Sequence, residues 1–225
     1  MVNDDAGSDD GANGPDRVGV GPHGEPWPIG DHYDPALLTD GDRRNVVDRY
    51  RYWKLDAIRA DLDTRRHPFH VAIENWQHDL NIGTVVRTAN AFLAAEVHIV
   101  GRKRWNRRGA MVTDRYQHVR NHPTPEDLAA WAGGAGIEII GIDNLPGSVP
   151  LDAEPLPRRC VLVFGQEGPG LSELMRPVLA QCRSIPQFGS TRSINAGVAA
   201  GIAMYSWIRQ HDPKEPPVGT ADRTA

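Results

Sequence analysis

The sequence has few cysteines and no long apolar run, and both absences limit the classes of protein to which it can belong. Only Cys160 and Cys182 occur among 225 residues, and neither is part of a Cys-x-x-Cys pair, so no zinc or other metal site is expected. No stretch reaches the roughly eighteen apolar residues of a membrane span, and the acidic N-terminus does not resemble a secretion signal. We therefore expect a cytoplasmic protein without membrane attachment, whose cysteines are small core residues.

Large apolar side chains are nearly missing before Trp27, and acidic residues dominate that part of the chain. Residues 1–30 are rich in Asp, Gly and Pro, so we predict disorder there, and we predict the same for residues 212–225, which contain three prolines. Residues 1–42 carry ten acids and one base, whereas residues 43–225 carry nineteen acids and twenty-four bases. The net charge of +5 in the second part suits contact with phosphates, and it equally suits an ordinary surface.

The segment from Asp42 to Asp63 has apolar residues at three- and four-residue spacing, which predicts one amphipathic helix. It is the main element of an expected N-terminal helical extension over residues 31–66. Arg44, Arg51 and Arg59 lie on the other side of this helix, either as a solvated face or as a surface that contacts RNA.

From residue 67 to residue 211, short apolar runs alternate with helical stretches. Continuous apolar strands separated by helices predict an α/β domain, a parallel sheet flanked by helices, and such sheets bind ligands beyond the carboxyl ends of their strands. The predicted strands are Phe69–Ile73, Val97–Val100, Ile137–Ile142, Cys160–Phe164 and Arg183–Pro186. The predicted helices are Gly83–Ala94, Pro125–Gly133, Leu171–Gln181 and Ile194–Gln210.

Three loops that follow predicted strands are rich in glycine and polar residues. They are Asn81-Ile-Gly-Thr-Val-Val-Arg87, Phe164-Gly-Gln-Glu-Gly-Pro-Gly-Leu171 and Ile185-Pro-Gln-Phe-Gly-Ser-Thr-Arg-Ser-Ile-Asn195. Taken singly, each has an ordinary explanation, because Asn81 or Ser193 can cap a helix and glycines are common in turns. Three such loops in this order are much harder to attribute to chance.

Together these motifs resemble those of the SpoU (TrmH-like) branch of the SPOUT superfamily of RNA 2′-O-ribose methyltransferases. The resemblance spans about residues 67–210. It implies a C-terminal trefoil knot, S-adenosylmethionine as methyl donor with S-adenosylhomocysteine as product, and a homodimer with active sites at or near its interface. It also implies methyl transfer to a ribose 2′-hydroxyl of tRNA or rRNA. Gly197 departs from the family pattern, in which many members have a small hydroxyl residue, and this leaves the arrangement of the knot helix open.

The residues expected in catalysis are Arg87, Asn81, Glu167, Ser193 and Asn195. A ribose hydroxyl is a poor nucleophile, so catalysis must align the reacting atoms and ease removal of the hydroxyl proton. Arg87 stays protonated in water, so we favour electrostatic positioning over the base role proposed in the family. Asn81 is expected to hold Arg87 or the ribose, with helix capping as the alternative. Glu167 is expected to orient Arg87 or balance its charge, within one subunit or across the dimer.

By the same resemblance, the loop backbones surround the adenosine part of the donor. The expected donor-binding residues are Ile142, Asn144, Gly165, Gln166, Ile185, Ser193 and Asn195. A basic segment after the second predicted strand is expected to bind RNA through phosphate pairing and stacking by its tryptophan, with a solvated loop as the alternative. Its residues are Arg102, Lys103, Arg104, Trp105, Arg107 and Arg108.

Three other functions compete with this interpretation. The first is a non-catalytic SPOUT-fold protein that binds RNA. The second is a nucleotide-dependent oxidoreductase, but residues 164–171 lack the Gly-x-Gly-x-x-Gly order of a dinucleotide-binding loop. The third is methyl transfer to a base nitrogen, against which the motif at residues 81–87 argues.

Overall fold

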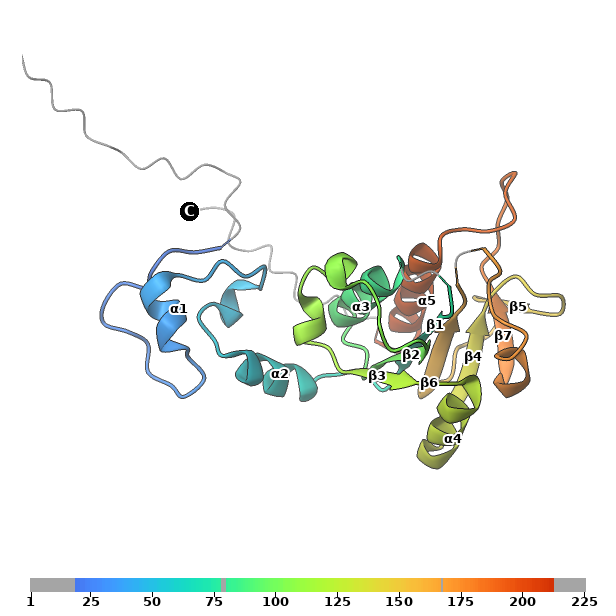
Figure 1. The fold of residues 1–225 in the computed structure, drawn as a ribbon, viewed down its shortest axis with the longest axis horizontal. Helices are drawn as coiled ribbons and strands as arrows, with labels where there is room; N and C mark the ends of the chain where they lie inside the picture. Colours follow the sequence, from blue (N-terminus) through green and yellow to red (C-terminus); the bar gives the residue numbers. More distant parts are fainter. Residues whose placement is uncertain (1–18, 78–79, 167, 213–225) are drawn as a thin grey trace, which may run out of the picture. The chain divides into compact units, whose positions relative to one another are not determined.

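The computed structural model describes residues 19–77, 80–166 and 168–212 (Figure 1). Contacts divide these residues into two compact units, one up to Ile58 and one from Arg59 onward. Helix α2 (Leu55–Asp63) contains this boundary, which lies before the boundary expected at residue 67. The disorder predicted for residues 1–18 and 213–225 concerns segments outside the described residues.

The first unit contains helix α1 (Pro35–Asp40) and the short 3-10 helix η1 (Asp48–Tyr50), followed by the start of α2. The prediction of one helix from Asp42 to Asp63 is therefore wrong. Tyr52 has a φ of 63°, which a right-handed helix does not tolerate, and its amide donates to the buried Asp42 carboxylate over 2.9 Å. Burial opposes ionisation of Asp42, but hydrogen bonds from Arg44 and from the Tyr52 amide outweigh it and lower its pKa to about 2.

Residues 19–30 also differ from the expectation of disorder. The amide of Val20 donates to the Asp42 carbonyl and the amide of Asp42 donates back, both over 2.9 Å, and the His23 amide donates to the Leu38 carbonyl over 2.9 Å. Leu38 is buried within this unit. Backbone pairing with the α1 region thus orders a segment that has few apolar side chains of its own.

The second unit is built on a seven-stranded sheet in which every pairing is parallel, with strand order β3-β2-β1-β6-β4-β7-β5. Its strands are β1 (His70–Asn75), β2 (Val97–Gly101), β3 (Val119–His122), β4 (Glu138–Ile142), β5 (Val149–Pro150), β6 (Cys160–Phe164) and β7 (Gln181–Ser184). The parallel sheet flanked by helices confirms the predicted fold class, and the trefoil knot stays a prediction.

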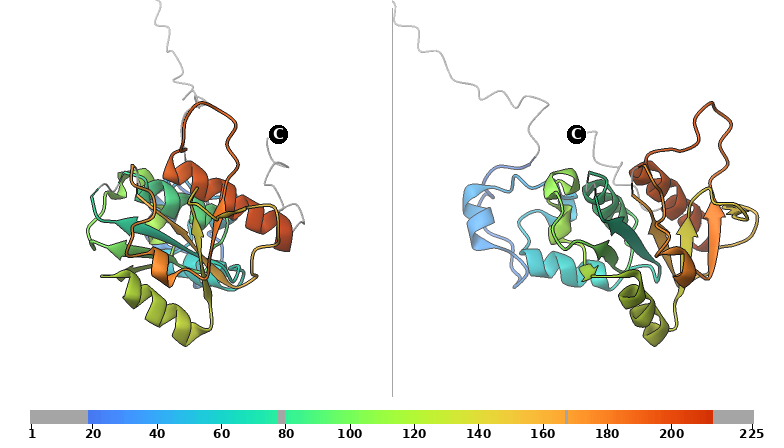
Figure 2. Two further views of the ribbon diagram at one scale, coloured as in Figure 1. Left: turned by 90° about the vertical axis from the view of Figure 1, so that its right-hand side faces the viewer. Right: turned by 45° about the vertical axis from the view of Figure 1, so that its right-hand side comes forward.

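Helices cover both faces of the sheet, as Figure 2 shows. Helices α3 (Ile82–Ala91) and α5 (Ala196–His211) pack on one face, and α4 (Pro125–Ala135) packs on the other. The short 3-10 helices η2 (Arg107–Ala110), η3 (Thr113–Arg115) and η4 (Arg176–Val178) lie in loops. Within the described chain, no helix combines the length and apolar composition needed to cross a bilayer.

The helix predicted over Leu171–Gln181 is wrong, because only η4 forms there. Backbone amides at its start donate to carboxylates from β1 and from the loop after β4: Leu171 donates to Asp143 over 2.8 Å and Ser172 donates to Glu74 over 2.7 Å. These bonds fix the chain in a non-helical path.

The cysteines are core residues as predicted. Both are free, Cys160 is fully buried in β6, and burial raises its pKa to about 12. Cys182 is partly buried against the core, and burial raises its pKa as well, so neither thiol is set up as a nucleophile.

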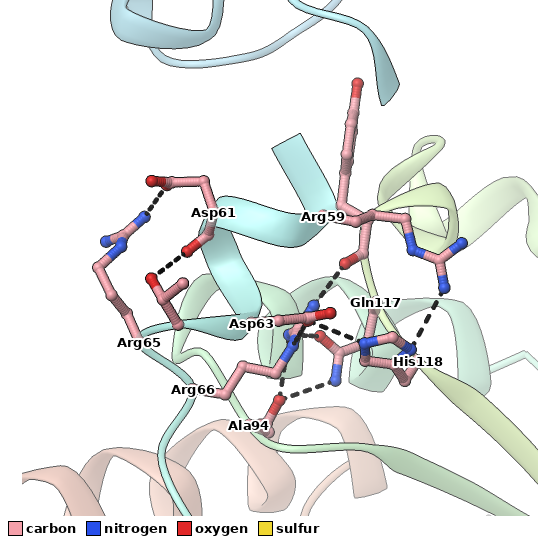
Figure 3. Close-up of polar contacts among 10 residues, drawn as sticks. Arg59, Asp61, Asp63, Arg65, Arg66, Ala94, Gln117 and His118 are labelled. Carbon is pink, nitrogen blue, oxygen red and sulfur yellow. Dashed lines mark hydrogen bonds and ion pairs between the residues drawn. The ribbon is translucent and has the colours of Figure 1, made fainter. Parts of the chain in front are cut away.

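A buried arginine fastens the segment after α2 to the sheet (Figure 3). Arg66 donates to Asp63 and Gln117, each over 2.6 Å, to the Tyr116 carbonyl over 2.7 Å and to the Ala94 carbonyl over 3.2 Å. Its side chain is only 7% exposed. Partial burial opposes ionisation of Asp63, but hydrogen bonds from Arg66 and His118 outweigh it and lower its pKa.

Replacing Arg66 by alanine is expected to lower the free energy of unfolding by about 3 kcal/mol, because several buried acceptors lose their donor at once. The matched control is Arg65→Ala, since Arg65 pairs with Asp61 over 2.9 Å at the surface and its removal should cost less than about 1 kcal/mol. Urea unfolding of both variants measures the difference. Equal losses would show that the Arg66 network adds nothing beyond a surface ion pair.

Candidate functional site

A cavity of about 500 Å³ opens where β4, β6 and β7 end. Its lining comes from three loops: residues 142–144 after β4, residues 164–166 and 168–170 after β6, and residues between 185 and 199 after β7. The segment between β7 and α5 extends away from the sheet as a long loop (Figure 2). The cavity lies beyond the carboxyl ends of parallel strands, which is where ligands bind in this class of fold.

The loop after β6 makes a tight turn that requires glycine. The amide of Gln166 donates to the Gly170 carbonyl over 3.1 Å, and the amide of Gly170 donates back over 3.2 Å. A Cβ atom on Gly165 would lie 2.0 Å from the carbonyl carbon of Gly170, a separation that no side chain can adopt. Gly165 therefore allows two backbone segments to touch at the cavity wall.

Buried side chains hold this loop against the sheet. Gln166 Oε1 accepts from the amides of Trp76 and Gln77, over 3.0 and 2.6 Å. Glu74 is fully buried at the end of β1, and its carboxylate accepts from the Ser172 hydroxyl over 2.5 Å and from the Trp76 indole over 2.8 Å. The cavity wall is thus fixed by hydrogen bonds to groups far away in the sequence.

Asn195 connects the loop after β7 to the start of α3. Its Nδ2 donates to Asn81 Oδ1 over 2.9 Å, while its Oδ1 accepts from the Gly197 amide and caps α5. Asn81 makes no side-chain cap bond in α3. Asn195 is therefore the residue that caps α5, and the capping role considered for Asn81 and Ser193 is not found.

The basic segment lies close to the start of α3. Asn75 Nδ2 donates to the carbonyls of Arg102 and Arg104, over 2.7 and 2.9 Å. A Cβ atom on Gly83 would lie 2.6 Å from the Ala110 amide, so α3 and η2 are in direct backbone contact. All five basic side chains of the segment are exposed, whereas Trp105 is partly buried against the core.

Comparisons with known proteins agree with this geometry. The family model described as the SpoU rRNA Methylase family matches residues 68–205. The chain belongs to the SpoU rRNA methylase family. A Mycobacterium bovis protein named as an uncharacterized tRNA/rRNA methyltransferase is 32% identical over 185 residues, which cover 79% of this chain and 56% of that protein. The chain therefore spans about half the length of the curated relatives it matches.

Solved structures share the fold. The tRNA modifying enzyme TrmH/SpoU of A. aeolicus superposes with a TM-score of 0.63 at 23% identity, over 71% of this chain and 83% of that one. The SpoU methyltransferase AviRb of Streptomyces viridochromogenes, solved with AdoMet, has a TM-score of 0.59 at 25% identity, over 67% of this chain and 60% of that one. A structure described as giving insight into 2-OH methylation on tRNA has a TM-score of 0.56 at 25% identity, over 66% of this chain and 99% of that one.

In this SpoU chain, all seven residues expected to bind the donor lie around the one cavity: Ile142, Asn144, Gly165, Gln166, Ile185, Ser193 and Asn195. Of the residues expected in catalysis, Asn81 and Asn195 are hydrogen-bonded to each other, and Ser193 also lines the cavity. Glu167 lies outside the described residues. Arg87 is exposed on α3, does not line the cavity, and has no hydrogen-bond or ion-pair partner among the described residues.

Sequence reasoning missed three polar residues that build the site. Asp143 lines the cavity and holds the Leu171 amide, Glu74 holds Ser172, and Asn75 holds the basic segment. A signal was present, because each stands at or directly after the end of an apolar strand, where polar side chains face a ligand site. Arg192 also lines the cavity and places a positive charge at its wall.

Proposed function

We propose that this chain transfers a methyl group from S-adenosylmethionine to a ribose 2′-hydroxyl of a tRNA or rRNA. The observation that carries the proposal is that the second and third motif loops line one cavity, while Asn195 of the third hydrogen-bonds Asn81 of the first. The cavity volume of about 500 Å³ falls in the range of roughly 300–1,000 Å³ that is typical of small-molecule sites. Gly165 brings backbone directly to the cavity wall, as a snugly held cofactor requires.

In this proposal, different residues bind the donor and position the ribose. The donor supplies a sulfonium methyl group that is already activated. The loops around Ile142, Gly165 and Ile185 hold its adenosine part, and Asn195 with Asn81 fixes the edge of the cavity that faces α3. Arg87 positions the ribose and the adjacent phosphate, because its fork of donors matches both groups and its charge favours loss of the hydroxyl proton.

A homodimer belongs to the same proposal. Along α5, Val198, Ile202 and Tyr205 are 54, 40 and 55% exposed, and their spacing makes one apolar stripe. Helix α3 packs beside this stripe, with Thr84 next to Gly197. A second copy that covers the stripe would also lie next to Arg87, so the exposed arginine would act at an interface. The five exposed bases of the segment 102–108 supply contacts for RNA phosphates.

The test is to incubate the full chain with donor labelled in its methyl group and with total tRNA and rRNA. Methylation of a 2′-oxygen removes the group that attacks the phosphodiester in alkali, so we expect the label in alkali-resistant dinucleotides. Label recovered on a base would contradict ribose transfer. Donor and RNA binding without transfer to any RNA would favour the non-catalytic RNA-binding alternative.

A further inference from the structure

Three histidines lie in a row on the α4 face of the sheet, and the proposed methyl transfer does not use them. His70 begins β1, His98 lies in β2 and His122 ends β3. His70 Nδ1 lies 3.0 Å from His98 Nε2, and His98 Nδ1 lies 2.9 Å from His122 Nε2. The ring of Trp131 packs over the row, with its centroid 4.2 Å from that of His98 and 5.0 Å from that of His70.

A carboxylate adds a third ligand at the His70 end of the row. Glu96, directly before β2, has Oε2 at 3.9 Å from His98 Nε2. One ligand atom each from His70, Glu96 and His98 lies within 4.8 Å of the others. His98 is fully buried, whereas His70 and Glu96 are partly exposed, so an ion can reach the set from solvent. Glu96 Oε1 accepts from Arg120 over 3.0 Å, which leaves Oε2 to face the histidines.

The hydrogen bonds of the row are compatible with an ion at that end. A neutral imidazole has one N–H and one lone pair. If His98 donates its Nδ1 proton to His122, its Nε2 lone pair points toward His70. Histidines that bind metals usually have their second ring nitrogen held by such a hydrogen bond. An ion between His98 Nε2 and His70 Nδ1 then requires only that the His70 proton moves to the other ring nitrogen, and it leaves no buried donor unpaired.

We propose that His70, His98 and Glu96 bind a divalent transition-metal ion of the class that imidazole prefers. Two nitrogens 3.0 Å apart, each about 2.1 Å from a metal, make an angle of about 90° at it. This angle suits square-planar or octahedral coordination better than tetrahedral, and Ni²⁺ readily adopts square-planar or tetragonal geometry with nitrogen and oxygen ligands. Glu96 Oε2, now 3.9 Å from His98 Nε2, must move about 1 Å closer to join the same geometry. Water fills the remaining positions on the exposed side. The bound ion ties the start of β1 to the start of β2 and stabilises the sheet.

The test uses the full chain, freed of metal with a chelator and titrated with Ni²⁺, Zn²⁺ and Mg²⁺ by calorimetry at neutral pH. We expect one Ni²⁺ per chain, weaker binding of Zn²⁺, no binding of Mg²⁺, and a higher unfolding temperature with Ni²⁺. His70→Ala and Glu96→Gln should each weaken Ni²⁺ binding by tenfold or more. His98 is left unchanged, because a substitution at this buried position risks unfolding.

His118→Ala is the matched control, since the His118 side chain pairs with Asp63 over 2.8 Å and does not belong to this ligand set. It should bind Ni²⁺ as the wild type does. Absence of Ni²⁺ binding by the wild type would overturn the proposal. Binding that survives both His70→Ala and Glu96→Gln would also overturn it, because it would place the ion elsewhere. The nearly isosteric Glu96→Gln keeps the test decisive if His70→Ala does not fold.

Discussion

Arg87→Ala is expected to reduce methyl transfer by about a hundredfold or more while the affinity for S-adenosylmethionine changes little, the size of loss seen when one electrostatic stabiliser is removed. The physical reason is the separation of the two tasks in the structure. Arg87 is exposed on α3 and does not line the cavity formed by the three loops. Donor binding should therefore survive its loss, whereas positioning of the ribose should not.

Single-turnover methyl transfer and donor calorimetry measure these two effects separately. Arg87→Lys keeps the charge but loses the two-pronged fork, so it should remain strongly impaired. Arg158→Ala is the matched control, because Arg158 is an exposed arginine just before β6, at the opposite end of the strands from the cavity. Normal turnover by Arg87→Ala would show that this residue has no role in the reaction. A large loss of donor affinity would show instead that it contributes to donor binding.

Gly165→Ala should have the second large effect, a loss of donor affinity of a hundredfold or more. The added Cβ would meet backbone at 2.0 Å, and a backbone contact cannot be relieved by rotating a side chain. The turn at residues 165–170 must then open, and the cavity wall opens with it. Calorimetric titration with S-adenosylmethionine measures the effect.

The control for this substitution is Gly133→Ala in α4, where an added Cβ meets nothing within 4 Å. Alanine in a helix is more favourable than glycine by about 1 kcal/mol, so this variant should be as stable as the wild type or more stable, and should bind the donor normally. If Gly165→Ala also binds the donor normally, the loop does not form the donor site.

The parts of the fold that sequence predicted well are those whose signal is local. Four apolar runs became β1, β2, β4 and β6, and three of the predicted helices became α3, α4 and α5. The fifth predicted strand, Arg183–Pro186, overlaps β7 but begins two residues late. The strands β3 and β5 were not predicted, because they are short and mostly exposed and hence lack an apolar pattern.

The two wrong helix predictions share one cause, namely polar side chains that bind backbone amides outside the local apolar pattern. Asp42 draws residues 42–52 into a loop, and Glu74 and Asp143 keep residues 171–181 from forming a helix. Apolar spacing does not report such bonds. The same holds within the site, where Ser172 and its partner Glu74 are 98 residues apart.

The candidate site was predictable from sequence to the extent that its chemistry is confined to short motifs. The second and third motif loops contain five of the seven expected donor-binding residues, and the structure brings these five to one cavity with Ile142 and Asn144. The histidine row was not predicted, and the expectation of no metal site rested on the cysteines alone. His70 and His98 become neighbours only because β1 and β2 pair in parallel with Ala72 beside His98.

A crystal structure of the full chain with S-adenosylhomocysteine tests most directly whether the three loops form a cofactor site. We predict one molecule per chain, enclosed by residues 142–144, 164–170 and 185–195, with the backbone at Gly165 in contact with it. Cofactor bound at another place, or a cavity that stays empty at saturating concentration, would contradict the assignment of this cavity and the methyl-transfer function that depends on it.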